Sequence, residues 1–414
     1  MQNAPMSALL PDALVMLAVI VAWLNDTFVG QAGRRTTYFI ALLGSVVAGV
    51  WFAVNAFDPN QYYFFSRMVV VDSFASAMKA VVSLGYAVSI VYSRKYLEDR
   101  DLFRGDFFLL GMFSLLGQLV MISGNNFLTL YLGLELMSLS LYAVIALRRD
   151  APQSNEAAMK YYVLGALASG FLLYGISMLY GATGSLELGE VWRVLSTQSF
   201  DKGVMLFGVI FIVAGIAFKM GAVPFHMWVP DVYQGAPTAM TLLTGGGPKV
   251  AAFAWGLRFL VMGLLPLAVD WQQMLVILAA LSMIVGNITG IVQRNIKRML
   301  AYSAILNAGY ILLGVISTTT KGVSATLFYL AAYGFATVGA FAVVTLVRES
   351  VRGGSEAEGD EDSITIGGEA TDLSAWAGLG KRSPRRPTCR RRHPKADRAA
   401  RSPCSRSPSK RASA

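Results

Sequence analysis

The chain has 414 residues, of which 55% are hydrophobic and only 14% charged. That composition is too apolar for two or three soluble domains and is typical of a membrane protein. The formal net charge of +10 belongs to the end of the chain, because residues 381–414 carry 13 Lys/Arg and one acid, whereas residues 1–380 carry 22 bases and 24 acids. The charge is therefore no sign that the whole chain binds nucleic acid.

Redox and metal chemistry have little support in the sequence. The two cysteines, Cys389 and Cys404, both lie in the basic end of the chain, so the body has no disulfide framework or thiolate site. No Gly-rich phosphate loop or pair of histidines on one helix face occurs. We expect no cofactor and no metal on this chain. We also expect no cleavable signal peptide, because the first apolar segment has no basic start and contains Asp26.

Apolar runs divide the chain into membrane-spanning helices. A helix needs about 20 apolar residues to cross a hydrocarbon core of about 30 Å, and the unbroken runs favour helices over barrel strands, which would alternate. The sequence predicts an all-α polytopic membrane protein with eleven spans, near 8–29, 36–57, 70–93, 106–123, 125–147, 158–180, 203–228, 238–266, 271–293, 299–317 and 323–347.

Basic residues in the connections predict the orientation. Four lie in even-numbered loops: Arg67, Arg193, Lys202 and Lys321. Fourteen lie in odd-numbered loops: Arg34, Arg35, Arg94, Lys95, Arg100, Arg104, Arg148, Arg149, Lys160, Arg294, Lys297, Arg298, Arg348 and Arg352. The positive-inside rule therefore predicts cytoplasmic odd loops and an N-terminus outside.

The composition changes twice after the last span. Residues 348–380 are acidic and Gly-rich and predict a solvated cytoplasmic loop, although Leu373 to Gly380 resemble the approach to another span. Residues 381–414 contain no Leu, Ile, Val, Met or aromatic residue. They are either a disordered basic tail on anionic lipid or an out-of-frame translation, which the abrupt shift favours.

Three ionisable residues lie inside predicted spans and are the main functional candidates: Glu135, Lys219 and Lys249. A charge at a helix centre costs about 2.5–3.5 kcal/mol on insertion scales, so such residues are rarely accidental. A buried carboxylate and ammonium lower each other's cost, and their separation tunes the proton affinity of the lysine. The pair is either a proton switch or a static ion pair that orients two helices.

Helix-breaking residues accompany both lysines. Gly221 and Pro224 follow Lys219, and Gly245-Gly246-Gly247-Pro248 precede Lys249. Irregular backbone at this depth requires protein or a wet cavity around it, and broken helices mark ion sites in many transporters. His226 has an ordinary pKa of about 6.5 that suits a relay between the lysines, although a structural donor is the alternative.

Other charges in or near spans are weaker signals. Lys79 is either functional or extends its amine to the interface, and Arg258 lies close enough to a span end to do the same. Arg294, Lys297 and Arg298 are expected to anchor the chain at the cytoplasmic interface.

Four segments resemble subunit N of proton-pumping NADH-quinone oxidoreductase, or complex I, within the antiporter-like family. They are Leu-Glu-Leu-Met-Ser-Leu-Ser-Leu-Tyr at 134–142, Lys-Tyr-Tyr-Val-Leu-Gly-Ala at 160–166, Phe-Lys-Met-Gly-Ala-Val-Pro-Phe-His-Met-Trp at 218–228 and Asn-Ile-Lys-Arg-Met-Leu-Ala-Tyr-Ser at 295–303. The segments at 218–228 and 295–303 are shared with antiporter-like proteins generally, whereas those at 134–142 and 160–166 point to subunit N. The likeness extends over about 8–380.

The resemblance implies a fourteen-helix fold with two inverted five-helix repeats. The expected parts are a three-helix segment at 1–105, a first repeat at 106–266 and a partial second repeat at 267–347, followed by the loop at 348–380 and the tail at 381–414. Helices twelve to fourteen and their exit lysine have no counterpart, since Lys381 and Lys395 lie outside apolar spans. The chain is therefore expected to be C-terminally truncated or frame-shifted.

The resemblance also assigns roles. It implies that Glu135 pairs with Lys219, that Lys249 is the central lysine, and that Lys160 and His226 are further relay positions. Quinone reduction elsewhere in the complex would shift the Glu135–Lys219 pair and send a proton towards Lys249. NAD, FMN, iron-sulfur clusters and quinone are expected on other subunits, and the partners are other membrane-arm subunits and the lipid of a bacterial inner membrane.

Two other functions stay open on the sequence alone. A cation/proton antiporter or membrane-bound hydrogenase subunit would share the lysines and the broken helices. A truncated remnant that does not pump would share them as well.

Overall fold

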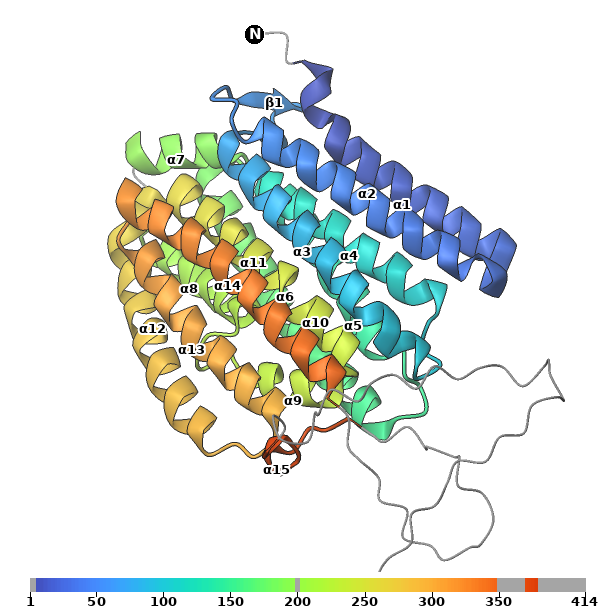
Figure 1. The fold of residues 1–414 in the computed structure, drawn as a ribbon. Helices are drawn as coiled ribbons and strands as arrows, with labels where there is room; N and C mark the ends of the chain where they lie inside the picture. The colour runs from blue at the N-terminus through green and yellow to red at the C-terminus, as the bar shows by residue number, and fades with distance from the viewer. Residues whose placement is uncertain (1–4, 198–201, 348–368, 379–414) are drawn as a thin grey trace, which may run out of the picture. The chain divides into compact units, whose positions relative to one another are not determined.

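The described part of the chain is almost entirely helical (Figure 1). The computed structural model describes residues 5–197, 202–347 and 369–378. Its helices are α1 (Leu10–Val29), α2 (Arg34–Asn55), α3 (Ser73–Glu98), α4 (Gly105–Ser123), α5 (Phe127–Ile145), α6 (Pro152–Thr183), α7 (Leu188–Thr197), α8 (Lys202–Met220), α9 (Trp228–Gly235), α10 (Thr238–Gly245), α11 (Gly247–Leu257), α12 (Ala268–Ile291), α13 (Ile296–Ile316), α14 (Thr320–Leu346) and α15 (Leu373–Trp376).

The predicted membrane-spanning architecture is confirmed. Among the described residues, ten helical stretches are long and apolar enough to cross a membrane, and each coincides with a predicted span. The remaining predicted span, 238–266, is broken into α10, α11 and a π-helix at Arg258–Gly263. Gly246 separates α10 from α11 with φ −92° and ψ −97°, a conformation outside the helical region. The interruption falls where the glycine run predicted it.

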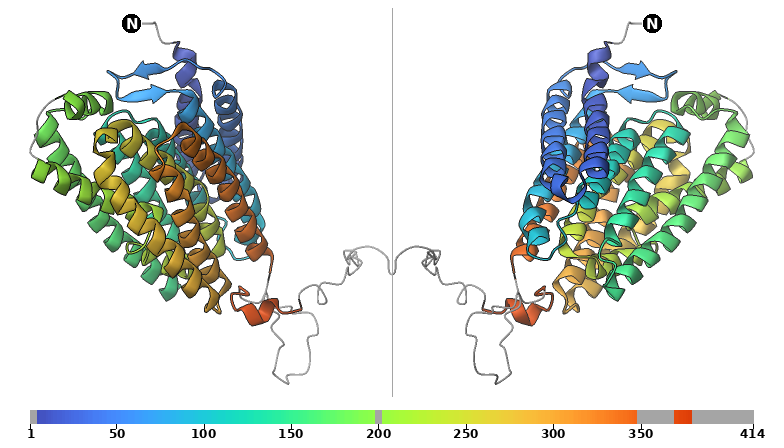
Figure 2. Two further views of the ribbon diagram at one scale, coloured as in Figure 1. Left: turned by 90° about the vertical axis from the view of Figure 1, so that its left-hand side faces the viewer. Right: turned by 90° about the vertical axis from the view of Figure 1, so that its right-hand side faces the viewer.

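Two short strands were not predicted. Strands β1 (Tyr62–Phe64) and β2 (Val69–Val71) form an antiparallel hairpin beside the first turns of α1 and α3 (Figure 2). The helix expected over 70–93 begins later, at Ser73. The Asp72 carboxylate accepts a hydrogen bond from Ala75 N at 2.7 Å and caps the helix there.

The core surrounds the broken helix. Helices α3, α4 and α14 pack against α10 and α11, and Figure 1 draws α10 and α11 within the bundle, behind α14. Trp255, Phe253 and Phe259, from α11 and the π-helix, are among the largest fully buried side chains. Polar groups on α10 and α11 are therefore shielded by protein on several sides.

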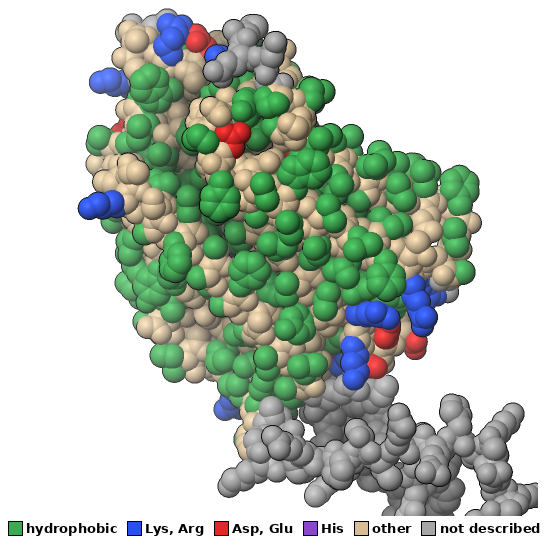
Figure 3. Space-filling model, turned by 45° about the horizontal axis from the view of Figure 1, so that its top comes forward, with side chains coloured by type: hydrophobic (Ala, Val, Ile, Leu, Met, Phe, Trp, Pro, Cys, Tyr) green, Lys and Arg blue, Asp and Glu red, His purple; other side chains and the backbone are tan. Residues whose placement is uncertain are grey.

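The helix surfaces that face outward are apolar. Large exposed side chains include Ile288 on α12, Phe328 on α14 and Leu43 on α2. In the view of Figure 3, hydrophobic side chains are spread over the surface of the bundle, and Lys and Arg lie towards its edges. This distribution is typical of a surface in contact with lipid acyl chains.

Chain contacts divide the protein into two units, residues 1–376 and 377–414. Of the second unit, only Ala377 and Gly378 lie within the described residues. The expected basic tail at 381–414 and most of the expected loop at 348–380 lie outside the described residues. Residues 369–376 belong to the first unit and differ from the expected solvated loop, because they are hydrogen-bonded to the start of α13.

Candidate functional site

Lys219 lies in the last turn of α8, and its side chain is only 5% exposed. Its ammonium donates a hydrogen bond to Ser138 Oγ at 2.8 Å and a longer one to Tyr142 OH at 3.4 Å. Both acceptors belong to α5. A buried cation therefore has two neutral oxygen partners on a neighbouring helix, which partly offset the loss of its hydration.

Glu135 lies on the same face of α5, three residues before Ser138 and seven before Tyr142. Its carboxylate accepts a hydrogen bond from the hydroxyl of Ser169 on α6. Lys219 forms its shortest hydrogen bond with Ser138 and not with Glu135 among the described residues, so the expected pairing of Glu135 with Lys219 stays a prediction. Glu135 thus lies about one helical turn before Ser138, the residue that holds the ammonium.

The backbone after Lys219 leaves the helix and is held by other elements. Gly221 has φ +74°, which favours glycine over any residue with a Cβ atom. Val223 N donates to Ser282 Oγ of α12 at 2.9 Å, and Trp228 Nε1 donates to Phe218 O at 2.9 Å. Side chains thus satisfy polar backbone groups that the broken helix exposes, as required inside a membrane.

His226 lies in this irregular segment between α8 and α9 and is partly buried. Its Nδ1 atom is buried without a hydrogen-bond partner in the described part of the chain. Neither Lys219 nor Lys249 forms a hydrogen bond with it in that part. The structure therefore leaves a gap between His226 and each lysine.

Lys249 lies in the first turn of α11, directly after the glycine run, and is 4% exposed. Its ammonium lies 5.5 Å from the centre of the Tyr233 ring and has no hydrogen-bond partner among the described side chains and backbone groups. Gln118 Oε1 and Tyr233 OH are also buried without a partner there. A buried cation with polar but unbonded surroundings fits a site that holds water in the membrane.

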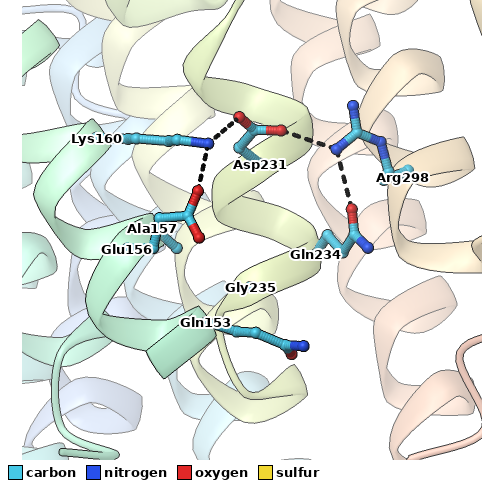
Figure 4. Close-up of a pocket in the computed structure, with 8 residues that line it drawn as sticks. All are labelled: Gln153, Glu156, Ala157, Lys160, Asp231, Gln234, Gly235 and Arg298. Atoms are coloured by element: carbon cyan, nitrogen blue, oxygen red, sulfur yellow. Dashed lines mark hydrogen bonds and ion pairs between the residues drawn. The ribbon is translucent and has the colours of Figure 1, made fainter. Parts of the chain in front are cut away.

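Lys160 belongs to a charged network that lines a pocket open to the surface (Figure 4). The pocket has a volume of about 230 Å³. It pairs with Glu156 at 2.8 Å and with Asp231 at 3.0 Å, and its side chain is 44% exposed. Asp231 also pairs with Arg298 at 2.8 Å. Burial raises the pKa of Asp231, but the hydrogen bonds from Lys160 and Arg298 outweigh it and hold that pKa below its usual range.

This network connects the two halves of the predicted repeat structure. Lys160 belongs to α6, Asp231 to α9 and Arg298 to α13. Tyr161, the residue after Lys160, stacks on Trp228 at 4.4 Å between ring centres and meets Tyr142 edge-on at 4.6 Å. Lys160 is therefore joined to the Lys219 group through packed aromatic rings and not through a direct hydrogen bond.

Several side chains in these groups were missed by sequence reasoning. Ser138 and Tyr142 share the face of Glu135, so the spacing of three and seven residues would have identified them. Ser169 and Asp231 gave no such signal, because their contacts join helices that are distant in the sequence.

Three weaker candidates take unexpected positions. Lys79 is buried and pairs with Asp12 at 2.7 Å, and Arg258 is buried and pairs with Asp72 at 3.0 Å. Both partners lie at helix starts, Asp12 in the first turn of α1 and Asp72 at the N-cap of α3, so the choice between a functional role and an extension to the interface stays a prediction. Lys297 is also buried, donating to Ala236 O at 2.5 Å, and so is no surface anchor.

Comparison with known proteins places this arrangement in a family. The family model described as "NADH:quinone oxidoreductase/Mrp antiporter, TM" matches residues 124–359. NADH-quinone oxidoreductase subunit N of Paraburkholderia phymatum is 71% identical over 394 residues, which is 93% of this chain and 77% of the relative. The subunit N of Cupriavidus taiwanensis is 52% identical and covers 86% of this chain and 74% of its own length.

Solved structures of other proteins are also similar to this chain. A chain of respiratory complex I from Thermus thermophilus has a TM-score of 0.69 and 32% identity, covering 81% of this chain and 70% of that one. A chain of an archaeal membrane-bound sulfane sulfur reductase has a TM-score of 0.77 at 24% identity, covering 91% and 75%, and shows the fold alone.

The described fold is that of an antiporter-like membrane protein, with broken helices carrying buried lysines. The chain belongs to the subunit N family of NADH-quinone oxidoreductase. The predicted family and fold class are thereby confirmed. It is a multi-pass membrane protein of the bacterial complex I assembly.

Proposed function

We propose that this chain translocates protons in the membrane arm of NADH-quinone oxidoreductase, driven by electron transfer from NADH to quinone in other subunits. The observation that carries the proposal is a buried ammonium, Lys219, held by Ser138 and Tyr142 of the helix that also carries Glu135. Such a pair is costly inside a membrane and is retained where charge moves.

The proposed mechanism uses two stages. In the first, Lys219 holds a proton while Glu135 is charged, and a change in their separation alters the proton affinity of the lysine. In the second, the proton passes through water to the neutral amine of Lys249, whose Nζ has no hydrogen-bond partner in the described structure. His226 and Lys160 are proposed as relay positions. The gap at His226 and the exposed position of Lys160 mean that water has to complete both links.

The cofactors, the partners, the orientation and the first repeat are part of the same proposal. NAD, FMN, iron-sulfur clusters and quinone are assigned to other subunits, and among the described residues no group of three or more His, Cys, Asp or Glu could hold a metal ion. The partners are other membrane-arm subunits and lipid. The odd-numbered loops face the cytoplasm, and α4 to α11 form the first repeat within 106–266.

Replacing each buried charge tests the proposal. Lys219→Ala and Glu135→Gln are expected to reduce NADH-driven proton pumping in inverted membrane vesicles to the background level, because the first removes the proton carrier and the second removes the charge that alters its proton affinity. Lys202→Ala is a matched control, since Lys202 begins the same helix but is exposed. NADH oxidation with an artificial acceptor and a native gel report whether the complex is assembled.

The same variants separate the alternatives. Wild-type pumping by an assembled complex that carries Lys219→Ala would contradict the proposal and support a structural remnant. Sodium transport that needs no NADH, and that is lost in Lys219→Ala, would favour a cation/proton antiporter instead.

A further inference from the structure

A buried carboxylate joins the segment after α14 to three helices. Glu369 lies at the start of the described residues 369–378, and its side chain is 18% exposed. The carboxylate accepts hydrogen bonds from Thr238 Oγ1 at 2.9 Å, Thr238 N at 3.2 Å and the Tyr96 hydroxyl. It also pairs with Lys297 Nζ at 3.1 Å. One side chain therefore contacts residues of α3, α10 and α13.

Backbone hydrogen bonds fix the segment that carries Glu369. Ile296 N donates to Thr371 O at 2.8 Å, and Leu373 N donates to Arg294 O at 2.9 Å. Asn295 and Asp372 form an isolated antiparallel bridge. Residues 371–373 are thus held along the start of α13, and Glu369 is directed between α10 and α13.

Helix α10 depends on this carboxylate for its first turn. The residue before it is Pro237, which provides no side-chain cap. Glu369 fills that role from outside the helix, because it accepts from the backbone N–H and the hydroxyl of Thr238. A carboxylate at a helix N-terminus is also favoured by the helix dipole.

The helix that Glu369 caps leads directly to the central lysine. Eight residues of α10 are followed by the break at Gly246 and then by Lys249 in the first turn of α11. The break leaves α10 without a continuous hydrogen-bond ladder to α11, so the placement of the glycine run depends on contacts made by α10. At the start of α10, Thr238 N donates such a contact to the carboxyl group of Glu369.

We propose that Glu369 is a positioning residue for proton transfer at Lys249, and that gain or loss of its proton changes how firmly the 369–376 segment holds the start of α10. This inference rests on the proposed function, in which Lys249 carries protons.

Protons can reach Glu369 from the surface. A cavity of 300 Å³ is lined by Glu369, Lys297, Arg148 and Gln234, among others. The charged and titratable groups around the carboxylate are Tyr96 on α3, Lys297 on α13, Arg100 stacked on the Tyr96 ring at 4.2 Å, and Arg148 across the cavity. Thr238 on α10 adds only neutral donors.

The direction of the pH effect follows from burial. Burial raises the pKa of Glu369 to about 7, against a smaller lowering by the Thr238 N–H. The docked segment therefore binds the proton more tightly than a free carboxyl would. Docking weakens as the pH rises from the ordinary range of a glutamate to about 7, and stays constant above it.

Hydrogen exchange in the assembled complex tests the contact. In Glu369→Ala, the amides of Thr238–Gly245 should exchange about tenfold faster than in the wild type at pH 6, because the acceptor of the Thr238 N–H and hydroxyl hydrogen bonds is lost and with it the helix cap. Asp372→Asn is the matched control, since Asp372 is on the same segment but exposed, and its carboxylate accepts a hydrogen bond from Ser374 N at 2.8 Å and not from α10. Unchanged exchange in Glu369→Ala would overturn the proposal.

A second variant isolates the proton. Glu369→Gln keeps an oxygen acceptor but cannot titrate, so the wild-type change in exchange and in pumping rate between pH 5.5 and about 7 should disappear. A wild-type pH profile in Glu369→Gln would overturn the switch. Should Glu369→Ala fail to assemble, Glu369→Gln alone decides the matter. Normal pumping by Lys219→Ala would instead refute the proposed function and leave the exchange result standing as a purely structural contact.

Discussion

The buried amine of Lys219 is held by neutral groups and not by a direct carboxylate contact. Ser138 Oγ is its shortest partner, and Tyr142 OH is longer by 0.6 Å. A hydrogen bond to a charged group contributes about 1.5–3 kcal/mol. The serine is therefore a part of the proton site as much as the glutamate one turn before it.

Removal of this hydroxyl gives a test at the residue scale. Ser138→Ala should lower NADH-driven proton pumping by about tenfold, because the ammonium loses its shortest acceptor. The measurement is the initial rate of vesicle acidification at a fixed NADH oxidation rate.

Ser140→Ala is the control for that experiment. Ser140 belongs to the same helix and is also buried, but its hydroxyl donates to Leu136 O within α5. Equal loss of pumping in both variants would mean that α5 is simply destabilised. Normal pumping in Ser138→Ala would remove the serine from the site.

At the scale of elements, the position of Glu135 depends on how closely α4 and α5 approach. A Cβ atom at Gly133 would lie 2.6 Å from Met121 N and 2.9 Å from Gly117 O, both backbone atoms of α4. Small residues at such crossings allow membrane helices to pack backbone to backbone. Glu135, two residues beyond Gly133, is placed by this contact.

Enlarging that glycine should separate the two helices. Gly133→Ala is expected to lower the stability of the assembled complex by about 1–3 kcal/mol or more, since backbone cannot move aside as a side chain can. The thermal midpoint of the purified complex measures the loss. Gly170→Ala is the control, because a Cβ atom at Gly170 of α6 meets nothing within 4 Å. Equal midpoints for the two variants would contradict this account.

At the scale of the whole molecule, basic residues in the loops predict the orientation. The loop after α5 contains Arg148, Arg149 and exposed Asp150, whereas the loop after α6 contains α7 with Glu190 and Arg193 paired. The positive-inside rule places the first loop in the cytoplasm and the second outside.

Thiol labelling measures that orientation. With Cys389 and Cys404 replaced by Ser, Asp150→Cys should react with a membrane-impermeant maleimide only in inverted vesicles, and Ser196→Cys only in right-side-out ones. Both positions are exposed. The reverse pattern would invert the proposed topology and place the Glu369 cavity on the opposite side.

Much of the architecture was predictable from the sequence. Apolar runs of about 20 residues identified every long helix, because a bilayer penalises any spanning segment whose backbone is not internally bonded. The glycine run before Lys249 identified the broken helix, and four motifs identified the family. The buried Glu135, Lys219 and Lys249 followed from their cost in the membrane, and their roles stay a prediction.

Tertiary structure decided the partners of each charge. Hydropathy does not predict which helices contact each other, and so it could not identify these partners. Lys219 contacts Ser138, Lys79 pairs with Asp12, and Arg258 pairs with Asp72. Glu369 is the clearest case, since it lies in an acidic, Gly-rich stretch typical of solvated loops and yet is buried against Lys297 and Thr238. Local composition determines whether a segment enters the membrane, but pairing depends on helix crossings that only the packed bundle defines.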